Sequence, residues 1–95
     1  MGREAPGALE IDLVEHNGGS SQGLYAYTLT VVDIVTGYSR RRAVPNRSQA
    51  AVFQAIEYIL HGWPMKPWGI HSDNGSEFMS NHLRRYCQKE ELAFT

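Results

Sequence analysis

The hydrophobic pattern of the chain changes its period at Pro45, and this change restricts the folds that the chain can adopt. Before Pro45, residues 9–16 alternate in polarity and residues 24–32 are rich in aromatic and β-branched side chains. Both patterns are typical of strands. A third strand is expected at 38–44, and turns at 17–23, which is rich in glycine, and at 33–37 separate the three. Short connections between successive strands predict an antiparallel meander.

Beyond Pro45 the apolar residues recur at the spacing of a helix. Ser48 has the hydroxyl of a good N-cap, and Gly62 is placed to stop the helix just before Pro64. The residues predicted to form the buried stripe of this helix are Val52, Phe53, Ile56, Ile59 and Leu60. Trp63 and Trp68 are expected to pack beside this stripe.

A strand, a helix and a last strand complete the predicted order. Residues 68–72 predict a short buried strand, and residues 92–95 the start of a final one. Between them, Ser80 or Asn81 is expected to cap a helix. Strand–helix–strand connections join parallel strands through right-handed crossovers, so the order β-β-β-α-β-α-β predicts an α/β layered domain.

The length of 95 residues suffices for one small domain. We expect residues 1–8 to form a tail or linker and residues 9–95 the folded part. The chain stops where a further helix is expected to cover the sheet, which suggests truncation. The uncovered apolar surface should cause self-association, and a clean monomer in light scattering at high concentration would contradict this expectation.

Composition excludes several classes of protein. Hydrophobic residues make up 42% and charged residues 20%, which argues against a disordered chain. No apolar stretch is long enough to cross a membrane and no secretory signal is visible, so we expect a cytoplasmic protein without a membrane partner. The one cysteine, Cys87, fits a reducing compartment and is expected to be a small buried side chain. The net charge of −1 gives no global case for nucleic-acid binding.

Two aspartates have unusual positions. Asp12 lies in the middle of an otherwise apolar strand, and Asp73 lies at the carboxyl end of the fourth strand, before Asn74 and Gly75. If the two strands are parallel neighbours, about 4.8 Å apart, the two carboxylates can converge. Two ionised carboxylates at one point repel each other, and either a raised pKa or a bound cation relieves the repulsion. An all-oxygen site suits Mg²⁺ or Mn²⁺. Alternatively, Asp12 bonds to local backbone and Asp73 makes an Asx-turn.

The segment Leu9-Glu10-Ile11-Asp12-Leu13-Val14, followed by Ile70-His71-Ser72-Asp73-Asn74-Gly75-Ser76-Glu77-Phe78, resembles the catalytic core of DDE transposases and retroviral-type integrases. Bacterial insertion-sequence transposases are the most similar in these motifs. The resemblance implies an RNase H-like fold with a mixed five-stranded sheet of order 3-2-1-4-5 and flanking helices. It covers about residues 9–95.

The same resemblance implies a mechanism and its residues. Asp12 matches the first catalytic aspartate of the family and Asp73 the second, and both would bind metal. The third acid is a glutamate about 35 residues after the second aspartate, which lies beyond Thr95. Two Mg²⁺ or Mn²⁺ ions would then support cleavage of a DNA end and its transfer to target DNA. The implied partners are transposon-end and target DNA and further copies of the protein.

Two other functions stay open at this stage. One is a nuclease of the same fold, which yields cut ends and no joined DNA. The other is a non-catalytic remnant that serves as a DNA-binding or oligomerisation module and tolerates loss of both aspartates. With only two of the three acids, residues 1–95 alone are expected to bind metal weakly and to transfer no strands.

Other polar residues near the two aspartates are weaker candidates. His16 shares the face of Asp12 and could touch the scissile phosphate, or it bonds to the adjacent turn. His71 could position a metal-binding carboxylate, or it is a buried neutral histidine. Asn74 could order a metal-bound water, and Glu77 could substitute for the third acid.

Positive charge is local. The densest patch could contact DNA phosphates, or it could protect an edge strand from pairing with another sheet. This patch consists of Arg40, Arg41, Arg42 and Arg47. A second group on the last helix has the same two interpretations, a solvated face or a contact to target DNA: Arg84, Arg85 and Lys89.

Overall fold

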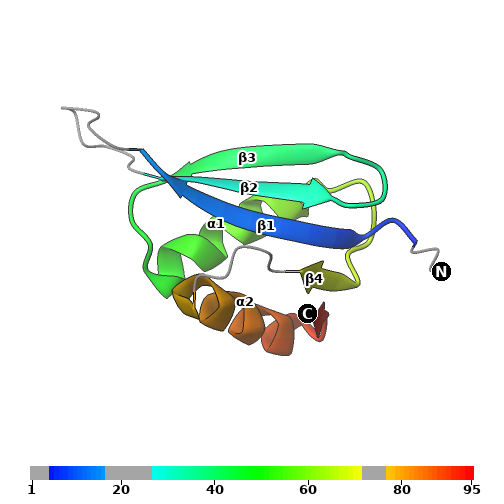
Figure 1. The fold of residues 1–95 in the computed structure, drawn as a ribbon. Coiled ribbons are helices and arrows are strands. Elements are labelled where there is room, and N and C mark those ends of the chain that lie inside the picture. Colours follow the sequence, from blue (N-terminus) through cyan, green and yellow to red (C-terminus); the bar gives the residue numbers. More distant parts are fainter. Residues whose placement is uncertain (1–4, 17–26, 72–76) are drawn as a thin grey trace.

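The computed structural model describes residues 5–16, 27–71 and 77–95. Five strands form one mixed sheet of order β3-β2-β1-β4-β5, which confirms the order expected from the sequence (Figure 1). In chain order the elements are β1 (Ala8–Glu15), β2 (Tyr27–Asp33), β3 (Ser39–Val44), α1 (Gln49–His61), β4 (Gly69–His71), α2 (Glu77–Glu90) and β5 (Ala93–Phe94).

The central strand β1 determines the arrangement of the sheet. It pairs antiparallel with β2 and parallel with β4, while β3 and β5 form the two edges. Residues directly opposite each other on paired strands have side chains on the same face. Leu9 and Ile11 therefore share one face with Val31, and Glu10 and Asp12 lie on the other.

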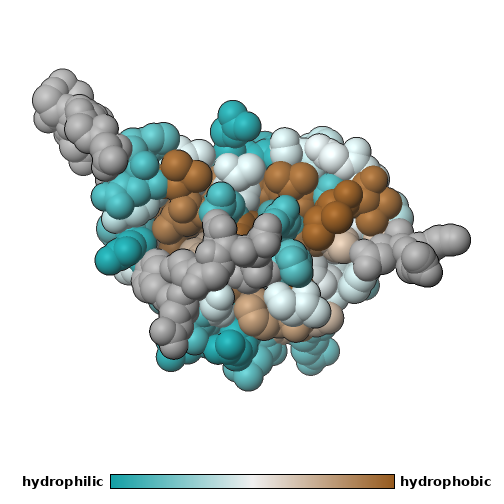
Figure 2. Space-filling view, viewed as in Figure 1, coloured by the Kyte–Doolittle hydropathy of each residue, from teal (hydrophilic) through white to brown (hydrophobic). Residues whose placement is uncertain are grey.

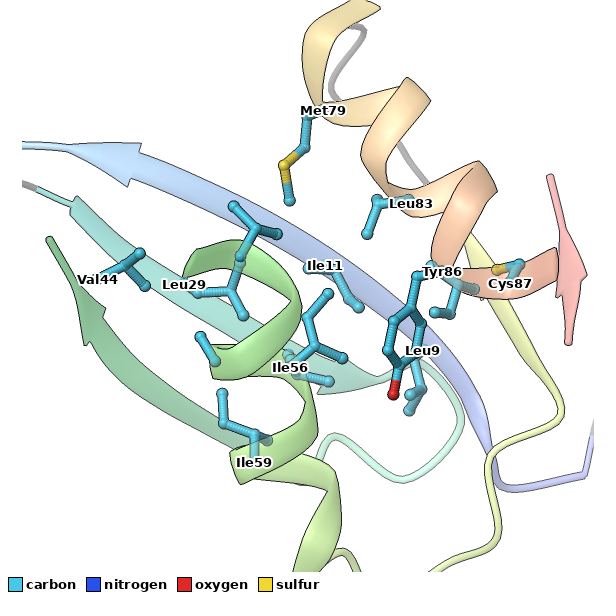
Figure 3. Close-up of a cluster of buried hydrophobic side chains, with 14 of the residues drawn as sticks. Leu9, Ile11, Leu29, Val44, Ile56, Ile59, Met79, Leu83, Tyr86 and Cys87 are labelled. Atoms are coloured by element: carbon cyan, nitrogen blue, oxygen red, sulfur yellow. The ribbon is translucent and has the colours of Figure 1, made fainter. Parts of the chain in front are cut away.

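Both helices cover the face that carries Leu9 and Ile11. Figure 3 shows these two side chains between Ile56 of α1 and Leu83 of α2. All four are at most 2% exposed. The helices also contact each other, because the rings of Phe53 and Tyr86 meet edge to face at 5.3 Å. The buried residues of α1 are Val52, Ala55, Ile56 and Ile59, so the predicted stripe is confirmed at its centre, with Phe53 and Leu60 half-buried beside it.

The predicted limits of α1 are confirmed. The Ser48 hydroxyl accepts a hydrogen bond of 3.1 Å from the backbone N–H of Ala51, and the helix ends at His61. Gly62 follows with φ −106°, so it ends the helix without the left-handed conformation that glycine often supplies there.

The predicted start of α2 is wrong. The helix begins at Glu77, so Ser80 and Asn81 lie inside it instead of capping it. Asn81 is exposed and its side-chain oxygen accepts a hydrogen bond from Arg84, one turn further on. A polar residue on the outer face of a helix costs little, and this explains why a good capping residue is a poor boundary marker here.

The two tryptophans behave differently from each other. Trp63 packs into the core, with its ring edge to face on Tyr38 at 4.8 Å, as expected. Trp68, expected beside the same helix stripe, is 43% exposed, and its indole N–H donates to the carbonyl oxygen of Ala5. The expectation for Trp68 is therefore wrong. Within the described residues, no helix is long and apolar enough to cross a membrane.

Candidate active site

Asp12 is a half-buried residue of β1 on the face of the sheet that the helices leave uncovered. It lies opposite Thr30 of β2, which in turn lies opposite Arg41 of β3. In the space-filling view of Figure 2, apolar side chains gather over the strands and hydrophilic ones over α2. A carboxylate in the middle of such a strand is costly unless it serves a ligand or a hydrogen bond.

On its other side β1 adjoins β4, as the convergence of the two aspartates requires. Leu9 pairs with Ile70 and Glu10 with His71, in parallel register. Asp73 and Asn74 lie outside the described residues, as does the side chain of Glu77. Across residues 5–16, 27–71 and 77–95, no three His, Cys, Asp or Glu side chains come together in a metal-binding group.

The two candidate histidines are both exposed and both bonded. His16 Nε2 is 2.7 Å from the hydroxyl oxygen of Thr28 on β2, so it bonds to the neighbouring strand. His71 Nδ1 is 3.1 Å from the hydroxyl oxygen of Thr95. The interpretation of His71 as a buried neutral histidine is therefore wrong, because its place at the uncovered side of β4 leaves it in contact with solvent.

The arginines of β3 alternate between the two faces of the sheet. Arg42 points to the helix side, where its guanidinium carbon lies 3.6 Å from the ring centroid of Tyr58. Arg40 lies on the same side, with one guanidinium nitrogen beside Gly62. Arg41 lies on the face of Asp12. Arg47 follows β3, and its carbonyl oxygen is hydrogen-bonded to Nε2 of His82 at a distance of 3.3 Å.

The cations of α2 have partners within the chain. Arg84 bonds to Asn81, and Arg85 donates to the side chain of Gln49 at 2.7 Å. Lys89 forms an ion pair of 2.7 Å with Glu57 of α1, and the hydrogen bond to this carboxylate is the main reason that the pKa of Lys89 is raised. The contacts of Arg85 and Lys89 tie α2 to α1 at the surface.

Asp33 is a buried carboxylate, which the sequence pattern predicts only as part of the turn at 33–37. It is fully buried, which by itself would raise its pKa. Hydrogen bonds from the backbone N–H groups of Thr36, Gly7 and Val35 outweigh this effect, so the pKa is lowered. These bonds are 2.7–2.9 Å long. Because its oxygens are already engaged, Asp33 is a structural residue, and an aspartate that starts a turn ending in Gly37 is the signal that could have revealed it.

A pocket of about 370 Å³ lies away from Asp12, near the start of β1 and beside β4. It is lined mainly by apolar atoms, and none of the described residues that line it is an aspartate or a glutamate. Its lining includes Ala8, Ile34, Trp68, Ile70, His71 and Thr95.

A mixed five-stranded sheet of order β3-β2-β1-β4-β5, with an aspartate on the central strand, defines the RNase H-like class of integrase catalytic cores. The model of the family described as "Integrase core domain" matches residues 2–94. The chain belongs to the integrase core domain family, which confirms the resemblance seen in the motifs.

The chain is similar to one known protein in sequence and to another in structure. The chain is 32% identical over 90 residues to an uncharacterised protein, y4rM, of Sinorhizobium fredii. That match covers 95% of this chain and 26% of the relative, so the chain spans about a quarter of the length of the relative. The crystal structure of the catalytic core domain of BIV integrase matches with a TM-score of 0.67 at 17% identity, over 94% of this chain and 53% of that one. At this identity the likeness concerns the fold.

Proposed function

We propose that the chain is part of the catalytic core of a transposase or integrase, a polynucleotidyl transferase that cleaves donor DNA ends and joins them to target DNA. The observation that carries the proposal is the place of Asp12 on the uncovered face of the central strand, beside β4. Family membership supports the same chemistry class. The proposed partners are DNA and further copies of the protein.

The register between β1 and β4 supports Asp73 as the second metal-binding residue. Each paired residue of β1 faces the residue 61 positions later in the chain. Asp73 follows His71, the last described residue of β4, by two positions, and Asp12 follows its partner Glu10 by two as well. Strands that kept this register would place the two carboxylates side by side, with Asn74 next to them.

The donor set of two carboxylates suits Mg²⁺ or Mn²⁺, which prefer oxygen ligands. When bound, such ions supply activation of water or a DNA 3′-hydroxyl and stabilisation of the leaving oxygen. In the proposed site Asp12 and Asp73 would hold the ions, and a glutamate beyond Thr95 would complete the set. His71 lies on β4 opposite Glu10, and from there it would orient neighbouring groups or the DNA. His16 follows Asp12 by four positions, which is about 13 Å along the strand, so it would act only on more distant DNA.

The metal site is tested by titrating the chain with Mn²⁺. Binding is detected as a loss of the free-ion signal in electron paramagnetic resonance. We expect weak binding that Asp12→Asn abolishes. Glu15→Gln is the matched control, because Glu15 is an exposed carboxylate of the same strand on the opposite face. Equal binding by wild type and Asp12→Asn would exclude Asp12 as a ligand.

Activity is tested in the longer protein that contains this segment. With Mg²⁺ and labelled donor ends, we expect joined DNA products that disappear in Asp12→Asn and Asp73→Asn. Cut ends without joined products would instead identify a nuclease of the same fold. Unchanged biological function after both substitutions would identify a non-catalytic remnant. Residues 1–95 alone are expected to join no DNA.

A further inference from the structure

The three consecutive arginines of β3 are divided between the two faces of the sheet. Asp12 lies opposite Thr30, and Thr30 lies opposite Arg41, so these three residues form one row across three strands on the same face. Adjacent strands are about 4.8 Å apart, which separates the backbone at Arg41 from that at Asp12 by about 10 Å. Arg40 and Arg42 flank Arg41 in sequence but lie on the helix side.

The neighbours of Arg41 are engaged with α1. The Arg42 guanidinium stacks on Tyr58 at 3.6 Å, and Arg40 lies against Gly62 at the end of the helix. Arg41 is exposed, and its side chain forms no hydrogen bond, ion pair or ring contact with any described residue. It therefore offers a full set of guanidinium donors to a ligand on the face of Asp12.

We infer that Arg41 binds a backbone phosphate of the DNA strand that is held at Asp12 and positions that strand across β2 and β3. This inference rests on the proposed function. The sequence suggested a DNA contact for all four arginines of the patch, and the inference assigns that contact to Arg41 alone. A duplex carries a phosphate every 3.4 Å of its axis on each strand. DNA that places one phosphate at Asp12 therefore has others within the width of three strands. Guanidinium groups bind phosphate strongly because two of their N–H groups can donate together.

Thr30 fits this arrangement because it leaves room between the two charged residues. Its side chain is short and half-buried, so nothing bulky from β2 stands between Asp12 and Arg41. The contact would be to phosphate alone, and it would therefore contribute affinity and orientation but no sequence preference.

The salt dependence of DNA binding tests the inference. Binding of the chain to a fluorescent duplex is measured by anisotropy at several salt concentrations with Mg²⁺ present. Loss of one phosphate contact lowers the slope of log K against log salt by about 0.9. We expect this change in Arg41→Ala and a largely preserved slope in Arg41→Lys. Arg42→Ala, on the same strand but the opposite face, should keep the wild-type slope.

Three outcomes would overturn the inference. An unchanged slope in Arg41→Ala, or an equal change in Arg42→Ala, would show that the contact is absent or not specific to this face. Greater light scattering of Arg41→Ala with an unchanged slope would mean that Arg41 only prevents edge-to-edge pairing. The Mn²⁺ experiment separates this failure from failure of the proposed function, because metal binding that depends on Asp12 would persist whatever Arg41 does.

Discussion

The carboxylate of Asp33, at the end of β2, accepts a hydrogen bond of 2.7 Å from the backbone N–H of Gly7, just before β1. The same side chain accepts bonds of 2.9 Å from Val35 and Thr36 in the turn that follows. One buried side chain thus fixes both the turn to β3 and the start of the central strand. This contact lies on the chain segment that places Asp12, five residues after Gly7.

Replacing Asp33 by alanine should destabilise the fold. The substitution leaves the buried N–H of Gly7 and two partly buried ones without acceptors, and one such loss costs about 1–3 kcal/mol. We expect a fall of at least about 2 kcal/mol in the free energy of unfolding, measured by urea denaturation. Glu15→Ala, at an exposed position of β1, should change it by less than about 0.5 kcal/mol. Equal effects of the two substitutions would contradict the role of Asp33.

The lowered pKa of Asp33 predicts acid sensitivity. A carboxyl group with a lower pKa in the folded chain than its ordinary 3.8 stabilises the fold when ionised. That contribution is complete above the ordinary pKa and is lost as the pH falls through the lowered one. Urea midpoints measured between pH 5 and pH 2 should therefore fall less steeply in Asp33→Asn than in wild type. Parallel curves would show that Asp33 contributes nothing to acid unfolding.

Gly7 and Gly37 provide a matched pair for measuring steric strain. Both have positive φ, +117° and +82°. A Cβ added at Gly7 would lie 2.3 Å from the carbonyl oxygen of Lys66, whereas at Gly37 no atom lies within 4 Å. Gly37→Ala should lower the free energy of unfolding by about 1 kcal/mol because of its backbone conformation. Gly7→Ala should lower it by a further ~1–3 kcal/mol because of the steric overlap. Thermal unfolding measures the difference, and equal losses would show that the contact with Lys66 relaxes freely.

Cys87 should react slowly with thiol reagents. It is 2% exposed, and burial raises the pKa of its thiol to about 11, so little thiolate is present at neutral pH. We expect the native chain to react with a disulfide reagent at pH 8 at least about tenfold more slowly than the urea-unfolded chain. Native and unfolded chains that react at the same rate would contradict the packing of α2.

The tryptophans should differ in fluorescence quenching. Trp63 is 9% exposed and Trp68 43% exposed. Acrylamide should therefore quench Trp63→Phe, which retains Trp68, more strongly than Trp68→Phe. The reverse order would place Trp68 inside the core.

Periodicity predicted the order of strands and helices along the chain and the extent of α1, because burial of one face imposes a regular pattern. The order of the strands within the sheet was implied by the resemblance to integrase cores. Periodicity missed Asp33, whose role depends on Gly7, a residue 26 positions away that no local pattern connects to it. It misplaced Trp68 because a large aromatic ring favours burial on average, whereas here its N–H bonds to Ala5 at the surface. For the site, the sequence placed Asp12 on a central strand, but only the register of three strands distinguishes Arg41 from Arg40 and Arg42.

The parallel pairing of β1 with β4 has a consequence for folding kinetics. The strands β1, β2 and β3 follow each other along the chain and can pair early. Each paired residue of β4, in contrast, lies 61 positions after its partner on β1. Contacts that close such long loops form late, because the entropy of closure must be overcome first. We therefore expect the edge of β1 that faces β4 to be completed last. The proposed metal site at that edge would then assemble only as folding finishes, which spares partly folded chains from capturing metal ions.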